Sequence, residues 1–131
     1  MLFAFLVIIV IMKNVKSLKL NKDFRRLYAR GAHKADKHIV VYALKNKQGL
    51  NRLGLTASKS VGNAVERNRA RRLMRESYRL LYDDIKKGID IIIVARKLCA
   101  SSKMPVIKAE LFRTLKKLGL IENEKSNINN H

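Results

Sequence analysis

The seven residues from Ile89 to Ala95, IDIIIVA, constrain the fold of this chain more than any other stretch. Asp90 is the one polar residue among them, and β-branched side chains dominate the rest. An apolar run of this length is typical of a strand that is covered on both faces. We therefore expect a β-sheet with this strand near its centre.

An amphipathic helix is predicted before this strand, beginning at Gly62-Asn63 and running to Leu81. Asn63 is a suitable N-cap residue, and Glu66 follows three positions later, as in a capping box. At about 100° per residue, apolar and basic side chains separate onto two sides of this helix. The predicted buried side comprises Ala70, Leu73, Met74, Ser77, Leu81 and Ile85. The predicted polar side comprises Asn68, Arg69, Arg71, Arg72, Arg75 and Arg79.

The polar side of this helix is almost purely arginine, with Glu76 as its single acidic interruption. Like charges on successive helical turns repel each other, and a bound polyanion relieves that repulsion. The whole chain has 29 Lys and Arg against 10 Asp and Glu, a formal net charge of +19. Since 47% of its residues are hydrophobic, it is not a disordered basic tail. These numbers favour nucleic acid as the partner, with a membrane surface second and a merely solvated helix face as the plain alternative.

The residues around this helix resemble the signature of the bacterial ribonuclease P protein component. They are Lys59, Gly62-Asn63-Ala64-Val65, Arg67-Asn68-Arg69 and Arg71-Arg72-Leu73-Met74-Arg75. The resemblance extends from about Ser17 to about Ile121. It implies an α+β two-layer sandwich, with a mixed sheet of about four strands and about three helices, like the second domain of a small-subunit ribosomal protein. It also implies a left-handed βαβ crossover, against the general right-handed rule.

The resemblance further implies a division of labour with RNA. In that family the partner RNA is catalytic and uses Mg²⁺ held by the RNA and its substrate. The protein binds the 5′ leader of precursor tRNA and raises substrate and metal affinity. The enzyme is therefore the holoenzyme, an endoribonuclease of tRNA processing, and this chain alone supplies neither a catalytic residue nor a metal site. The signature residues expected to face RNA are Lys59, Asn63, Arg67, Asn68, Arg69, Arg71, Arg72 and Arg75. Arg67 projects toward the apolar edge, so it can instead brace the fold.

A shorter helix is predicted from about Lys22 to Ala29, capped by Asn21 and ended by Gly31. Phe24, Leu27 and Tyr28 share one of its faces, and packing in the core explains that spacing equally well. The resemblance implies that Phe24 and Tyr28, together with Tyr42, border the leader cleft, where aromatic rings stack on bases of any sequence. Arg25, Arg26 and Arg30 would add contacts to phosphate.

Two strands, 38–44 and 52–58, are predicted to form a hairpin across the polar turn 45–51. A last helix is predicted to begin at Ser101 or Ser102, with Pro105 in its first turn and Gly119 at its end. Its stripe of Ile107, Leu111, Leu115 and Leu118 is expected to be core.

Residues with catalytic chemistry do not cluster in the sequence. Cys99 is the only cysteine, and we expect it to be a packing residue in a protein of the reducing cytoplasm. His33, His38 and His131 have no metal-ligand spacing. Asp83 and Asp84 are adjacent at a helix end, and we interpret them as structural. An autonomous metal nuclease needs more clustered carboxylates than this.

The chain divides into an apolar extension (1–11), a domain (12–121) and a polar tail (122–131) expected to be disordered. The first segment, MLFAFLVIIVI, is shorter than the roughly 20 residues of a membrane span. It can be an upstream extension, a packed element or a short anchor. We expect no membrane partner, and a monomer within the holoenzyme. Two alternatives stay open: a ribosomal-type RNA-binding protein, and a basic protein attached to anionic lipid.

Overall fold

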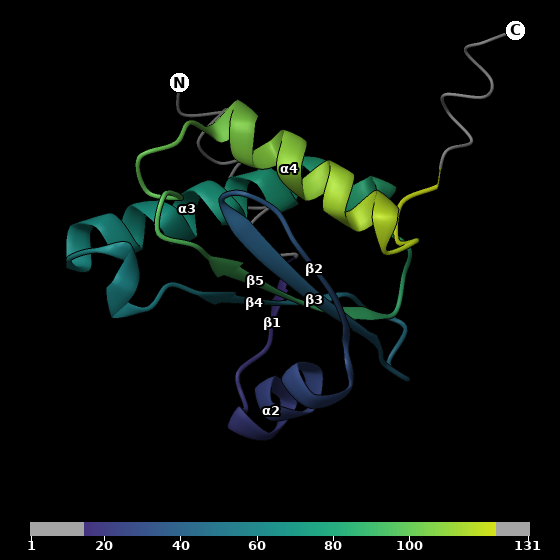
Figure 1. Ribbon diagram of the computed structural model, residues 1–131. Coiled ribbons are helices and arrows are strands. Elements are labelled where there is room, and N and C mark those ends of the chain that lie inside the picture. Colours follow the sequence, from purple (N-terminus) through teal and green to yellow (C-terminus); the bar gives the residue numbers. More distant parts are fainter. Residues whose placement is uncertain (1–14, 123–131) are drawn as a thin grey trace, which may run out of the picture.

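The computed structural model describes residues 15–122, which form a five-stranded mixed sheet and three α-helices (Figure 1). The strands are β1 (Lys16–Ser17), β2 (Ala32–Ala35), β3 (Ile39–Lys45), β4 (Arg52–Thr56) and β5 (Ile89–Ala95). The helices are α2 (Asn21–Arg30), α3 (Ala64–Leu81) and α4 (Met104–Lys117). The predicted α+β class and the three long predicted helices are confirmed.

Strand β5 occupies the middle of the sheet, whose order is β1-β4-β5-β3-β2. It pairs in parallel with β4 and antiparallel with β3. Ile91, Ile92 and Ile93 are fully buried, so successive side chains are covered on opposite faces. The prediction of a central strand covered on both faces is confirmed.

The predicted hairpin between the strands at 38–44 and 52–58 is wrong. Strands β3 and β4 are consecutive in the chain, but β5 lies between them and pairs with both. The physical reason is that β5 is apolar on both faces and therefore takes the most buried position in the sheet. The hairpin partner of β3 is instead β2, with His33 opposite Tyr42.

Strands β1 and β2 were not predicted, because neither shows the alternation of apolar and polar residues that is typical of a half-buried strand. All of their residues are exposed. They are short edge strands, a common way to limit the exposed edge of a sheet.

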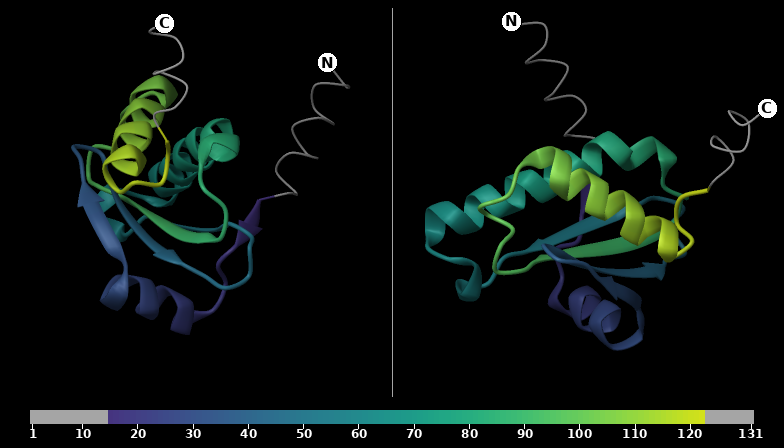
Figure 2. Two further views of the ribbon diagram at one scale, coloured as in Figure 1. Left: turned by 90° about the vertical axis from the view of Figure 1, so that its right-hand side faces the viewer. Right: turned by 45° about the horizontal axis from the view of Figure 1, so that its top comes forward.

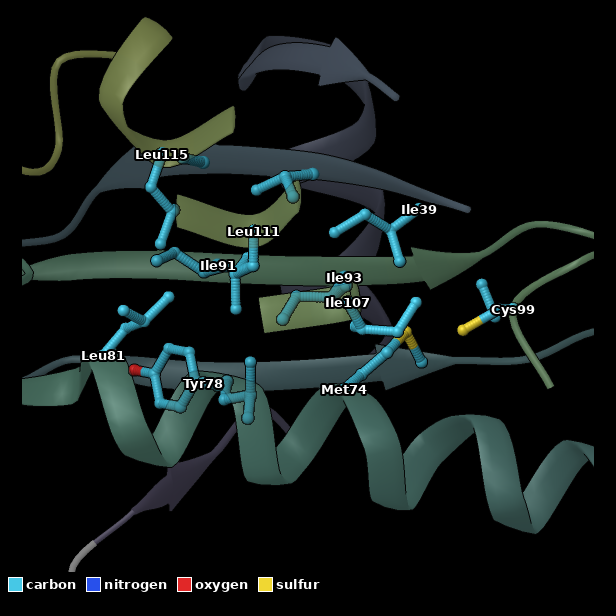
Figure 3. Close-up of a cluster of buried hydrophobic side chains, with 14 of the residues drawn as sticks. Ile39, Met74, Tyr78, Leu81, Ile91, Ile93, Cys99, Ile107, Leu111 and Leu115 are labelled. Atoms are coloured by element: carbon cyan, nitrogen blue, oxygen red, sulfur yellow. The ribbon is translucent and has the colours of Figure 1, made fainter. Parts of the chain in front are cut away.

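Helices α3 and α4 cover one face of the sheet, and α2 crosses the other (Figures 1 and 2). The main core lies between the sheet and the helix pair (Figure 3). Met74, Tyr78 and Leu81 of α3 point toward β5, while α4 contributes Ile107, Leu111 and Leu115. On the other face, Leu27 of α2 packs with Ile92 and Leu18 in a smaller cluster. Helix α2 therefore covers only part of its face and leaves the flanking strands open to a ligand.

The ends of the helices match the predictions unevenly. The capping box of α3 is confirmed, since Asn63 accepts from the Glu66 amide at 2.9 Å and Glu66 accepts from the Asn63 amide at 3.1 Å. The predicted Asn21 cap is wrong, because Leu20 is the N-cap residue of α2 and provides no side-chain cap. Helix α4 begins after Lys103 rather than at Ser101 or Ser102, with Pro105 in its first turn.

The chain passes from β4 through α3 to the neighbouring parallel strand β5. This is the predicted βαβ unit. The left-handedness of its crossover connection stays a prediction. Segment 1–11 and residues 123–131 of the predicted tail lie outside the described residues, so the predictions for them also stand untested.

Candidate nucleic-acid interface

The basic side of α3 divides into arginines that brace the fold and arginines that are free. Arg69 donates from Nε to the Ala100 carbonyl at 2.8 Å and from Nη2 to the Ser102 carbonyl at 3.5 Å. It therefore ties α3 to the loop before α4. Arg71 donates to the Asn68 side chain at 3.0 Å and to the Ala57 carbonyl at 3.4 Å. Both arginines were predicted to face RNA, and both have a structural role as well.

Four other signature cations have side chains that make no hydrogen bond or ion pair within residues 15–122. They are Lys59, Arg67, Arg72 and Arg75. Lys59 and Arg72 are exposed, and Arg67 and Arg75 are half-buried. Arg67 was predicted to face RNA, with bracing of the fold as an alternative. Its side chain has no partner among the described residues, whereas those of Arg69 and Arg71 do. Free guanidinium groups on a rigid helix suit bidentate contact with phosphate oxygens.

A cleft of about 260 Å³ brings one predicted leader-binding residue together with arginines of α3. Arg71, Arg75 and Arg79 of α3 line one wall, and Phe24 of α2 lies on the other side. We call this the aromatic–arginine cleft. Its remaining lining residues are Val15, Ser17, Leu18, Leu53, Gly54 and Leu55. The Phe24 ring and three guanidinium groups thus border one hollow, although about 50 residues separate them in the chain.

A row of rings continues from Phe24 along the sheet. The centroids of Phe24 and Tyr28 are 6.5 Å apart, and those of Tyr28 and Tyr42 are 4.9 Å apart in an edge-to-face contact. The His33 ring stacks on Tyr42 at 5.3 Å. Tyr28 is 43% exposed, and its hydroxyl lies 3.3 Å from that of Thr56. Such rings offer stacking surfaces to unpaired bases.

The predicted residues do not all meet in this cleft. Its lining does not include Lys59, Asn63, Arg67, Asn68, Arg69 or Arg72, nor the predicted leader-binding residues Tyr28, Tyr42 and Arg25. The Arg25 side chain is exposed without a partner in the described part of the chain. Sequence reasoning missed His33, because the strand β2 that places it beside Tyr42 was not predicted. It also missed Gly54, on which the Phe24 ring rests.

A buried carboxylate fixes α2 over the sheet. Asp90 of β5 is fully buried and accepts from Arg52 at 2.8 and 2.6 Å, from Arg26 at 3.3 Å and from Asn46 at 2.7 Å. The hydrogen bonds from Arg52 to Asp90 raise the pKa of that guanidinium. Arg26 and Arg52 also approach Asp23 at 3.4 and 3.7 Å. Arg26 is therefore a structural residue, although the resemblance implied a phosphate contact for it.

The structure also places the side chains that have metal-binding or nucleophilic chemistry. Among residues 15–122, no group of three or more His, Cys, Asp or Glu could hold a metal ion. The buried aspartates Asp23 and Asp90 are paired with guanidinium groups. Cys99 is buried, and burial raises the pKa of its thiol to about 11, so it is a poor nucleophile at neutral pH. Cys99 is a packing residue, as expected.

A basic helix, a cleft with aromatic rings and an open sheet face define a nucleic-acid-binding protein of the α+β class. The family model described as Ribonuclease P matches residues 12–119. The chain belongs to the ribonuclease P protein family, and it is accordingly a protein subunit of the ribonuclease P holoenzyme that works with ribonuclease P RNA.

Relatives and solved structures agree with this assignment. The chain is 41% identical to the ribonuclease P protein component of Alkaliphilus oremlandii over 86% of this chain and 98% of that one. It is 45% identical to that of Clostridioides difficile over 79% of this chain and 88% of that one. The Staphylococcus aureus protein structure superposes with a TM-score of 0.74 at 34% identity, covering 82% of this chain and 99% of that chain. The Thermotoga maritima protein structure superposes with a TM-score of 0.68 at 27% identity, covering 75% of this chain and 93% of that chain.

None of the helices within residues 15–122 is both long and apolar enough to cross a bilayer.

Proposed function

We propose that the aromatic–arginine cleft, together with the rings of Tyr28 and Tyr42 in the row that continues from Phe24, holds the 5′ leader of precursor tRNA, while the free cations of α3 bind ribonuclease P RNA. The observation that carries this proposal is that Phe24 shares one cleft with Arg71 and Arg75. A single strand needs ring faces for its bases and cations for its phosphates, and this cleft offers both. Stacking is tolerant of sequence, which suits leaders that differ between tRNAs.

The same proposal assigns the chemistry to RNA. Ribonuclease P RNA and the substrate hold the Mg²⁺ ions, and the protein raises their affinity by neutralising nearby phosphate charge. We further propose that the chain acts as a monomer within the holoenzyme, in the cytoplasm. Its single cysteine supports a reducing compartment.

Cleavage of precursor tRNA by a bacterial ribonuclease P RNA at low Mg²⁺ tests this function. We expect the protein to restore cleavage at the mature 5′ end. Replacing Tyr28→Ala removes one stacking ring, worth about 1–3 kcal/mol, so precursor affinity is expected to fall roughly tenfold or more. The affinity for mature tRNA, which has no leader, should not change.

Tyr28→Phe is the matched control, because it keeps the ring and removes only the hydroxyl near Thr56. It should retain most of the precursor affinity. A folded protein that binds RNA tightly but gives no stimulation would instead favour a ribosomal-type RNA-binding role. Equal losses for precursor and mature tRNA in Tyr28→Ala would argue against a leader contact.

A further inference from the structure

A second hollow lies on the side of α2 away from the aromatic row. Its volume is about 560 Å³, and it runs between α2 and the end of β3 with the loop that follows. We call it the basic groove. Its lining residues are Leu20, Lys22, Asp23, Arg26, Arg30, Leu44, Lys45, Asn46, Lys47, Gln48 and Arg52.

The floor of the basic groove is electrostatically balanced. Arg26 and Arg52 pair there with Asp23 and with the buried Asp90. These two guanidinium groups therefore offset the two carboxylates beneath them, and the floor attracts an anion only weakly.

The walls of the groove, by contrast, carry charge that nothing offsets. The side chains of four cations are exposed and make no hydrogen bond or ion pair within residues 15–122; they are Lys22, Arg30, Lys45 and Lys47. They project from two elements, α2 and the strand end with its loop, so they face the groove from both sides. Like charges gathered around a concave surface focus a positive potential that favours a bound polyanion.

The loop that carries Lys47 is held in place rather than free. The Asn46 amide donates to Asp90 at 2.7 Å and to the Leu50 carbonyl at 2.9 Å, and its oxygen accepts from the Gln48 amide at 2.9 Å. The buried Asn51 oxygen accepts from the Ile89 amide at 2.9 Å. The wall cations are thus presented on a backbone that needs no ordering on binding, which lowers the entropic cost.

The groove fits a single strand better than a duplex. Its volume falls within the roughly 300–1,000 Å³ of ordinary ligand pockets, which has room for a short stretch of nucleotides. Leu20, 54% exposed, and Leu44 supply apolar surface beside the cations. Unpaired bases can rest on such surface, whereas the bases of a duplex are stacked on each other.

The two hollows also adjoin each other. Leu18 and Phe24 line the aromatic–arginine cleft, and Leu20 and Asp23 line the basic groove. On the sheet, Leu53 belongs to the first and its neighbour Arg52 to the second. The first turn of α2 thus contributes residues to both hollows.

We propose that the basic groove binds the phosphate backbone of the leader upstream of the nucleotides held in the aromatic–arginine cleft. This inference rests on the proposed leader binding and adds a second, sequence-independent site to it. It predicts that leader length controls affinity through lysines that lie outside the signature helix.

Precursor tRNAs with leaders of about 5 and about 15 nucleotides test the proposal, with the reconstituted holoenzyme as the binder. We expect the longer leader to strengthen wild-type binding about tenfold at moderate salt. The triple variant Lys22→Gln/Lys45→Gln/Lys47→Gln should lose that gain and bind the short-leader precursor normally. The variant should fold, because its three side chains are exposed and unpaired in the described structure.

The matched control removes the same charge elsewhere, with Lys97→Gln/Lys116→Gln/Lys117→Gln, and should keep the gain. If the triple groove variant keeps it too, the proposal is wrong. The triple groove variant could also bind ribonuclease P RNA alone and both precursors more weakly by the same factor. That result would assign the groove to the RNA subunit, and the proposal would again be wrong. If the wild-type protein binds precursor more tightly than mature tRNA but binds both leader lengths with equal affinity, the groove proposal is wrong and the proposed leader binding in the cleft stands. No preference for precursor means that the proposed leader binding itself fails.

Discussion

Single residues decide how closely α2 approaches the sheet. Asp90 was visible in the sequence as the polar exception in an apolar strand, but its partners were not. Arg52 is 38 residues away and Arg26 is 64, and no pattern in a single sequence links positions so distant. Charge burial is costly unless every partner is present, so this network specifies one position for α2.

Gly54 is the second such residue, because the Phe24 ring lies directly on it. A Cβ at this position would stand 2.8 Å from Phe24 Cζ and 3.3 Å from Ile92 Cγ1. We expect Gly54→Ala to displace the ring and lower the free energy of unfolding by about 1–2 kcal/mol. Urea unfolding monitored by circular dichroism measures the change.

A double-mutant cycle gives the control for Gly54→Ala. In a Phe24→Ala background the ring is absent, so the added methyl group should cost much less. The same loss in both backgrounds would mean that Phe24 is not what the new Cβ meets.

At the scale of elements, the helices were the most predictable parts. The sequence established α3 with its capping box because the signals are local: Asn63 and Glu66 lie within one turn. The pairing of strands was not predictable, since β5 lies between β3 and β4 for reasons of burial that involve the whole sheet. The division of α3 arginines into braces and free cations also depends on a neighbouring loop that helical periodicity does not describe.

This division predicts opposite phenotypes for two neighbouring arginines of α3. Arg69→Ala removes hydrogen bonds to the Ala100 and Ser102 carbonyls, so we expect a loss of about 1–2 kcal/mol in the free energy of unfolding. Arg72→Ala removes an exposed, unpaired side chain and should change stability by less than about 0.5 kcal/mol. Thermal unfolding and binding to ribonuclease P RNA should be measured for both variants.

In the binding assay Arg72→Ala should weaken RNA affinity about fivefold to tenfold, as expected for a lost phosphate contact. Arg69→Ala should weaken RNA affinity less than Arg72→Ala does, when both variants are compared at a temperature at which Arg69→Ala is fully folded. The reverse order of effects would place Arg69 on the RNA and refute its assignment as a brace.

The whole molecule carries a formal net charge of +19 on 131 residues, and its stability is expected to depend on anions. Self-repulsion destabilises such a fold, and ligands that bind only the folded state stabilise it by mass action. A few millimolar pyrophosphate is expected to raise the melting temperature by about 5 °C. Differential scanning calorimetry provides the measurement.

Sodium chloride at equal ionic strength is the control, because it screens charge without occupying the cleft. It should raise the melting temperature by a smaller amount. An equal rise in both salts would mean that screening alone accounts for the stabilisation and that no phosphate site forms.

The central place of β5 has a consequence for how the chain acquires its structure during synthesis. Strands β3 and β4 leave the ribosome well before β5, yet neither is the other's partner. Their shared neighbour ends at Ala95, so the sheet cannot close until most of the domain has been translated. Pairing between segments so far apart is slow, and the nascent chain exposes two apolar strand edges while it waits. Because translation is vectorial, the sheet of this protein therefore forms only after β5 has been synthesised.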